Sequence, residues 1–116
     1  MYVDGFVVPV KTARKDEFRV IARESAEIFR KCGALRVVEN WSDDVPGGTN
    51  TSFPLAVKLE DDETAVFSWV EWPDKAARDA GNAKIESDPR MAAQMATGIL
   101  SGKRLIYGGF SNIIDL

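Results

Sequence analysis

Residues 2–10 read YVDGFVVPV, and this stretch decides the fold. Its apolar side chains occupy both alternating faces, a pattern typical of a central strand that is covered on both sides. The strand is expected to close at Pro9, because proline cannot donate to a strand ladder. The chain then repeats apolar positions at three- and four-residue spacing, which predicts an amphipathic helix that Thr12 caps and Gly33 ends.

Strands and helices continue to alternate after Gly33. The half-polar stretch 34–42 predicts a strand at a sheet edge, and the Gly-Pro-Asp-rich segment 43–52 predicts a loop. The β-rich runs 53–59 and 64–72 predict a hairpin around an acidic turn. Further along, a helix is expected to begin at Pro73, a shorter one at Asp88-Pro89 ending at Gly98, and a last, central strand over 105–114.

This order predicts one α+β domain over residues 1–116, with a ferredoxin-like antiparallel sheet and its helices on one face. The Tyr-Gly-Gly-Phe string at 107–110 echoes Tyr-Val-Asp-Gly-Phe at 2–6. Glycines weaken a strand unless another backbone approaches closely, so we expect the first and last strands to be neighbours that meet at their glycines.

Composition excludes several classes of protein. The net charge of −3 lacks the positive excess that supports nucleic-acid binding, so no nucleic-acid partner is expected. There is no histidine and one cysteine, which rules out an internal disulfide and the common zinc and haem ligand sets, and we expect neither metal nor cofactor. Since the first residues contain no basic leader and no apolar run has membrane-spanning length, a cytoplasmic protein without membrane contact is expected.

The sheet face without helices is expected to be rich in aromatic side chains. A large exposed apolar patch usually marks an interface, so the sequence predicts a homodimer that stacks two such faces around a cavity. The candidate residues for this face are Tyr2, Phe6, Trp41, Phe67 and Trp69.

Three carboxylates are candidates for acid–base chemistry, because Asp4, Glu39 and Glu71 each stand in a predicted strand among apolar neighbours. Burial would raise the pKa of such a group toward the range of a general acid or base. A hydrogen-bonded or solvated strand residue is the plainer alternative. Asp4 is the preferred candidate because its strand is central.

Aromatic and basic side chains supply candidate ligand-binding residues. Trp41 and Trp69 could form the walls of a small-molecule pocket, although packing alone also explains tryptophans. Arg78 and Asn82 stand one turn apart on a predicted helix, where they could bind an anion or simply face solvent. Tyr107, at the start of the Tyr-Gly-Gly-Phe string, completes the set.

Several uncommon strings give the chain a resemblance to a known family. They are the opening MYVDGFVVPV, DDVP at 43–46, TSFP at 51–54, VFSW at 66–69 and YGGF at 107–110, joined by Asp79, Asn82, Lys84 and the Asp-Pro-Arg at 88–90. With them the sequence resembles the YbaA-like bacterial family, domain of unknown function 1428. The resemblance implies a dimeric α-β barrel. That superfamily includes cofactor-free monooxygenases, haem-degrading enzymes and binding or stress proteins.

The family has no established reaction, so the resemblance assigns no catalytic residue. Taken together, the sequence predicts a homodimer that binds a small, partly apolar molecule between its sheets. A second interpretation is a cofactor-independent monooxygenase or isomerase in the same cavity, with Asp4 as proton acceptor. A third is a protein-interaction or stress-related module without cavity chemistry, since the fold alone does not choose among them.

Overall fold

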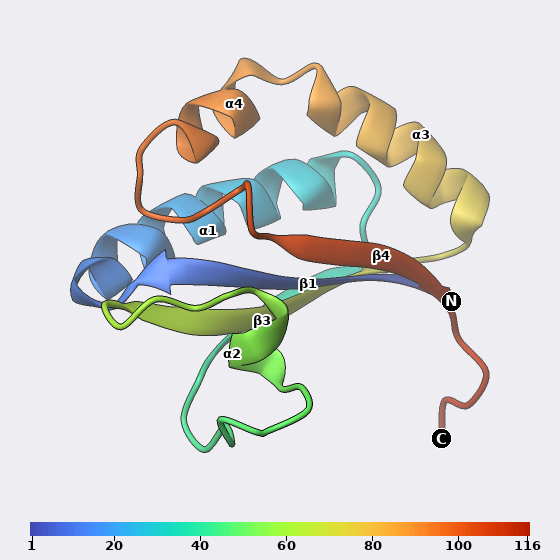
Figure 1. Ribbon diagram of the computed structural model, residues 1–116. Helices are drawn as coiled ribbons and strands as arrows, with labels where there is room; N and C mark the ends of the chain where they lie inside the picture. Colours follow the sequence, from blue (N-terminus) through green and yellow to red (C-terminus); the bar gives the residue numbers. More distant parts are fainter.

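The computed structural model describes residues 1–116 as a four-stranded antiparallel sheet with strand order β2-β3-β1-β4. Helices α1, α3 and α4 lie over one face of this sheet (Figure 1). This is the ferredoxin-like α+β arrangement that the sequence predicted. The strands are β1 Tyr2–Lys11, β2 Arg36–Trp41, β3 Glu63–Trp72 and β4 Ile106–Ser111, and the helices are α1 Lys15–Lys31, α2 Phe53–Ala56, α3 Lys75–Glu86 and α4 Pro89–Met95, with a 3-10 turn over Thr12–Arg14 before α1. None of the helices combines the length and apolar character needed to cross a membrane.

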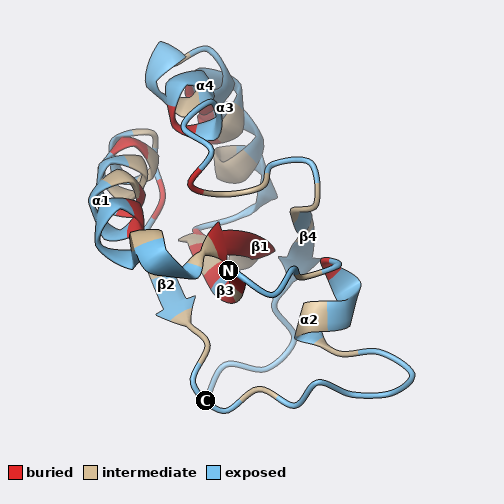
Figure 2. Ribbon diagram, turned by 60° about the vertical axis from the view of Figure 1, so that its left-hand side comes forward, coloured by how far each residue is buried: buried red, intermediate tan, exposed pale blue.

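The two central strands, β1 and β3, pair along their whole length, from Tyr2 opposite Trp72 to Lys11 opposite Glu63. Side chains that stand opposite one another in this antiparallel ladder share a face. Val8 and Val66 therefore point together toward the helices, and they pack in a buried cluster with Phe18 of α1. Figure 2 shows the buried residues concentrated in these strands and in the helix surfaces above them.

Residues 53–59 do not form the predicted strand, and the hairpin interpretation is wrong. The Ser52 hydroxyl accepts a hydrogen bond from the Leu55 N–H at 3.0 Å, and Pro54 stands in the first turn of the short helix α2. Both features favour the start of a helix. Val57, which follows, is fully buried against Val7 and Ala65, so this segment covers part of the sheet face opposite α1.

The last strand is present but is not central. β4 pairs only with β1 and forms an edge of the sheet, where Tyr107 and Phe110 are exposed. The predicted neighbour relationship holds, since Gly5 of β1 lies opposite Gly108 of β4. An apolar sequence on both faces therefore did not mean that both edges of this strand were paired.

Two helix starts also differ from prediction. Thr12 does not cap α1, because its hydroxyl lies 2.7 Å from that of Thr64 and a 3-10 turn precedes the helix. Pro73 lies just before α3, whose cap is Asp74, with its carboxylate accepting from the Ala77 N–H at 2.8 Å. Gly33 ends α1 as predicted, with a positive φ of 111°.

The strand register shows that part of the set of residues predicted for the open face is wrong. Tyr2, Phe6 and Trp41 stand opposite Trp72, Ser68 and Val66 respectively, so they lie on the face covered by the helices and not on the open one. Phe67 and Trp69 do lie on the open face, as predicted. A shallow hollow of this face is lined by Met1, Val3, Gly5, Phe67, Trp69, Glu71 and Phe110.

Candidate functional site

A pocket of about 130 Å³ lies between the sheet and the helices α1 and α4. Twelve of the sixteen residues that line it are hydrophobic. The volume is close to that of an engineered apolar cavity of roughly 150 Å³ that accepts benzene, so one ring-sized molecule fits. Its apolar lining is Phe6, Val8, Phe18, Ile21, Ala22, Phe29, Val37, Val70, Met91, Met95, Leu100 and Leu105, and its polar lining is Ser25, Glu39, Ser68 and Gln94.

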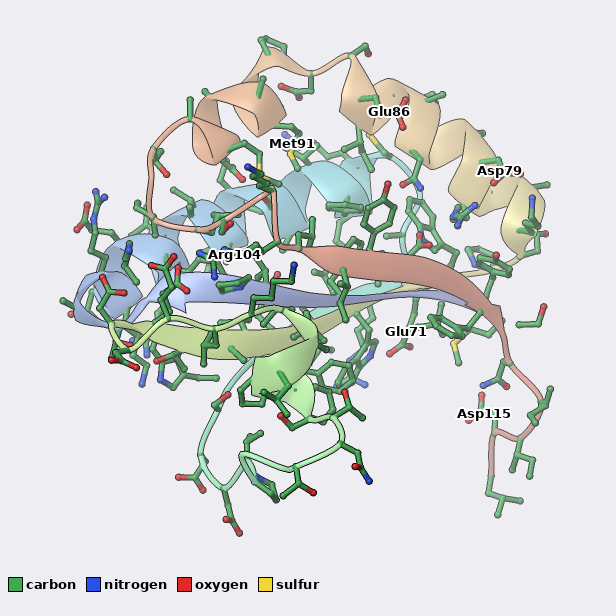
Figure 3. All side chains as sticks on the ribbon, viewed as in Figure 1. Glu71, Asp79, Glu86, Met91, Arg104 and Asp115 are labelled. Atoms are coloured by element: carbon green, nitrogen blue, oxygen red, sulfur yellow. The ribbon has the colours of Figure 1, made fainter.

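The periodicity of α1 supplies one wall of this pocket. Phe18, Ala22, Ser25 and Phe29 recur at three- and four-residue spacing, which places them on one side of the helix. α4 supplies the opposite wall, and Met91, labelled in Figure 3, lies between α4 and α1. The helices therefore stand above the sheet without closing the space between them.

Two of the polar lining groups are tied to each other on the α1–α4 side. The Ser25 hydroxyl donates to the side-chain oxygen of Gln94, and the Gln94 amide nitrogen donates to Glu24 at 2.8 Å. Gln94 is buried, so these bonds satisfy an amide that would otherwise be costly to desolvate. This pair fixes α4 on α1, and the remaining polar lining forms a second wall of the pocket.

Glu39 and Ser68 form that other polar wall. They stand opposite each other on β2 and β3, on the face covered by the helices. The apolar surroundings disfavour the charged form of Glu39 and raise its pKa to about 7, while hydrogen bonding by the Ser68 hydroxyl acts in the opposite direction. Glu39 is the only ionisable side chain in the lining of this pocket.

Water reaches Glu39 because the residue stands on β2, an edge strand of the sheet. The residue is exposed by area although protein surrounds its carboxyl group, so its charge is only partly desolvated when the pocket is empty. A neighbouring groove on the outer side of α1 also reaches Glu39 and is lined by the cations Lys15, Arg19 and Arg23. None of them forms an ion pair with Glu39, since Arg23 pairs with Glu27 and Lys15 lies over the Trp41 ring.

Asp4, the preferred catalytic candidate, lies in a different cluster. Its buried carboxylate accepts from Arg78 Nε at 3.0 Å and from Trp72 Nε1 at 3.0 Å. The Arg78 guanidinium also pairs with Asp79 at 2.9 Å and lies over the Tyr2 ring, and these carboxylates raise the pKa of Arg78. The arrangement joins α3 to β1, and neither Asp4 nor Arg78 lines the pocket.

The other predicted ligand residues do not converge on one site. Trp41 faces the helix side beside the groove of α1, whereas Trp69 is on the open face and donates to Glu71 at 2.9 Å. Tyr107 is exposed on β4 and stacks on Phe6, and Asn82 lies half-buried on α3. The structure therefore brings together Asp4 and Arg78 but separates the two tryptophans by the thickness of the sheet.

Basic side chains of the protein form ion pairs with the acidic turn that precedes and begins β3. Glu60, Asp62 and Glu63 gather their carboxylates within 4.8 Å of one another. Arg104 contacts Glu63 at 2.6 Å and Lys11 contacts Asp62 at 2.9 Å. These two cations offset two of the three carboxylate charges, and Arg104 attaches the segment before β4 to the start of β3.

Sequence reasoning found one of the four polar pocket residues, Glu39, and gave it no preference over Asp4. Ser25 falls at the spacing of the apolar positions of α1, and neither it nor Gln94 or Ser68 was singled out. The signal for Ser25 was available, because a hydroxyl on the buried side of a helix needs a partner. Its partner Gln94 is 69 residues away in the chain, which no local pattern reveals.

Comparisons with known proteins find relatives of this chain in sequence. Residues 1–101 match the family described as protein of unknown function DUF1428. The Escherichia coli K12 protein named "Uncharacterized protein YbaA" is 53% identical over 114 residues, covering 98% of this chain and 97% of the relative.

Solved structures with the same fold have low sequence identity. SnoaB from Streptomyces nogalater, described as a cofactor-independent oxygenase, aligns with TM-score 0.62 and 16% identity over 99% of this chain and 96% of its own. A dimeric ferredoxin-like protein from an uncultured marine organism aligns with TM-score 0.62 and 13% identity over 99% and 98% of the two chains. An uncharacterized NIPSNAP domain protein from Burkholderia xenovorans aligns with TM-score 0.58 and 16% identity over 97% of this chain and 95% of its own. By the family match and the identity to YbaA, the chain belongs to the DUF1428 family.

Proposed function

We propose that the protein is a homodimer in which each subunit binds a small, largely apolar molecule in the pocket between its sheet and its helices. The observation that carries this proposal is the open, ring-sized space with twelve apolar lining residues and four polar ones, Glu39 and Ser68 among them. Binding sites for small molecules combine these features, with an apolar body of the site and a few polar groups that orient the ligand. The proposal moves the ligand from the predicted inter-sheet space to the other face of the sheet.

The dimer part of the proposal rests on the open face. Phe110 is 62% exposed and Phe67 43% exposed on this face, and Ile113 and Ile114 of the C-terminal tail are exposed too. The tail leaves β4 toward the side of the sheet that lacks α1, α3 and α4 (Figure 1). A solved protein of the same fold is described as dimeric. A second copy that stacks its own open face there would remove these side chains from water.

Light scattering tests the dimer. The wild-type protein is expected at about twice the chain mass of 12.8 kDa. Phe110→Glu places a charge in the proposed interface and should yield monomers. Val20→Glu is the matched control, because Val20 is an exposed apolar residue on α1, away from the open face, and its variant should remain dimeric. A monomeric wild-type protein at micromolar concentration would contradict this part of the proposal.

Ligand binding is tested with p-xylene, a neutral ring of suitable size, by titration followed in NMR spectra. Resonances of residues lining the pocket should shift on addition. Ala22→Met fills part of the pocket and should weaken binding about tenfold or more, whereas Ala80→Met, at an exposed position of α3, should leave it unchanged. Absence of pocket shifts in the wild-type protein would leave the third interpretation, an interaction module without cavity chemistry.

A second candidate function is a cofactor-independent monooxygenase or isomerase in the same pocket. It is favoured by a carboxylate of raised pKa on the pocket wall, which could accept a proton from a substrate. Glu39 suits this role better than Asp4, whose carboxylate is already held by Arg78 and Trp72. Enzymatic turnover that is retained in the Asp4→Asn variant but lost in the Glu39→Gln variant would support Glu39 as the proton acceptor. The reverse result would restore Asp4 as the proton acceptor.

A further inference from the structure

We propose that the natural ligand of this pocket carries a weakly acidic hydrogen-bond donor, such as a phenol or an enol, and that the Glu39 carboxylate receives that donor while the apolar walls hold the rest of the molecule. This inference rests on the proposed function, because it names the class of ligand for the same site. It follows from the position of Glu39 among the lining residues and from the state of the other polar groups there.

The polar groups on the α1–α4 wall already have partners. Ser25 donates to Gln94, and Gln94 donates to Glu24. The wall formed by β2 and β3 has Glu39 and Ser68, which stand side by side in the ladder. An ionised carboxylate has about four lone-pair positions and accepts only, so one neighbouring hydroxyl leaves it with unused acceptor capacity. The pocket therefore offers an acceptor to the ligand and offers no cation.

The cations near Glu39 are directed elsewhere. On α1, Arg23 pairs with Glu27 at 3.3 Å and Lys15 lies 5.0 Å from the centre of the Trp41 ring. Arg19, also on α1, lines the outer groove and not the pocket. On β3 the facing residue is the neutral Ser68, and α4 contributes no charged residue to the lining. An anionic ligand would place its charge against the Glu39 carboxylate, so the site selects against carboxylates and phosphates.

The protonation of Glu39 then decides which ligands bind best. A ligand in the pocket displaces water from the pocket side of the carboxyl group, so the charged form is favoured with ligands that supply a donor. A phenol does so, and its own ionisation lies near 10, so it remains a donor around neutrality. A hydrocarbon of the same shape does not, and it should bind better to the protonated, neutral form. The pKa of Glu39 of about 7 places this change in an accessible range.

The experiment compares p-cresol with p-xylene, which differ by a hydroxyl in place of a methyl group. Affinities are measured by NMR titration between about pH 5.5 and about pH 9, where p-cresol stays neutral over most of the range. We expect the ratio of the two affinities, p-cresol over p-xylene, to rise about tenfold as Glu39 loses its proton. The reason is that a hydrogen bond to a charged group strengthens binding about tenfold more than a hydrogen bond between neutral groups.

Glu39→Gln should abolish the dependence of this ratio on pH while both probes still bind. Glu71→Gln is the matched control, because Glu71 occupies a neighbouring strand but lies on the open face, below the sheet in Figure 3. It should keep the wild-type pH profile. If both probes bind the pocket but their ratio is constant with pH, or still varies in Glu39→Gln, the ligand class is wrong and the binding site stands. If neither probe binds, the proposed function itself fails.

Discussion

Arg78 of α3 forms an ion pair with Asp4 of β1 through two nitrogens, Nε and Nη2, each 3.0 Å from the same carboxylate oxygen. Asp4 is buried and also accepts from Trp72, whose ring is fully enclosed. Gly109 lies opposite Asp4 on β4, and a side chain there would collide with Arg78 and with the Tyr2 hydroxyl. The glycine of the Tyr-Gly-Gly-Phe string therefore makes room for an ion pair that fastens a helix to the central strand.

Breaking this ion pair should cost much of the stability of the domain. Arg78→Ala leaves the Asp4 carboxylate buried with one donor, and we expect the free energy of unfolding in urea to fall by about 3 kcal/mol. Lys75→Ala is the control, because the Lys75–Asp79 pair on the same helix is exposed. Equal stability of the Arg78 variant and wild type would show that Asp4 is not fixed by this contact.

Gly81 on α3 tests the packing of that helix on the sheet. A Cβ at this position would lie 2.5 Å from the Trp72 ring and 2.8 Å from the Cys32 carbonyl oxygen. Gly81→Ala should therefore lower the free energy of unfolding by about 2 kcal/mol, despite the better helix propensity of alanine. Gly47→Ala, at a position with open space around it, should change stability little. A more stable Gly81 variant would mean that α3 can move away from Trp72.

Glu63 and Arg104 should make stability fall in acid. Arg104 and the Glu60 backbone N–H lower the pKa of Glu63 below its ordinary 4.5. Because the folded pKa lies below the unfolded one, the pair stabilises the protein above about pH 4.5 and loses this contribution as pH falls further. Glu63→Gln should be less stable than wild type in urea at pH 7, and the difference should shrink as pH falls below about 4.5. A difference that stays constant with pH would contradict the ion pair.

Glu39 should have the opposite effect on stability. Its folded pKa, about 7, lies above the ordinary value of 4.5, so the empty protein loses stability as pH rises from about 4.5 to about 7. Glu39→Gln should therefore be more stable than wild type at pH 8, by on the order of 1 kcal/mol because water in the open pocket screens the charge. The two proteins should unfold alike in urea near pH 4. A less stable variant at pH 8 would show that the carboxylate is favourably bound in the folded protein.

Local pattern determined most of the fold. The apolar run at 2–10, the β-rich run at 64–72, the periodicity of α1 and the glycine at its end were sufficient to predict a ferredoxin-like sheet with helices on one face. Each of these signals depends on side chains that are close in the chain. The prediction failed at 53–59 because Ser52 and Pro54 outweighed the β-rich composition that follows them. It failed at β4 because an edge strand whose two faces are both apolar shows the same hydrophobic pattern as a central strand.

The site was decided by tertiary structure. The sequence identified Asp4, Glu39 and Glu71 as strand carboxylates among apolar neighbours, and no local pattern shows which of them lines a pocket. Register places Glu71 on the open face, Arg78 holds Asp4 from 74 residues away, and of the three only Glu39 lines the pocket between the sheet and the helices α1 and α4. The charge state of a carboxylate depends on which distant residues surround it, and only the folded chain brings those residues together.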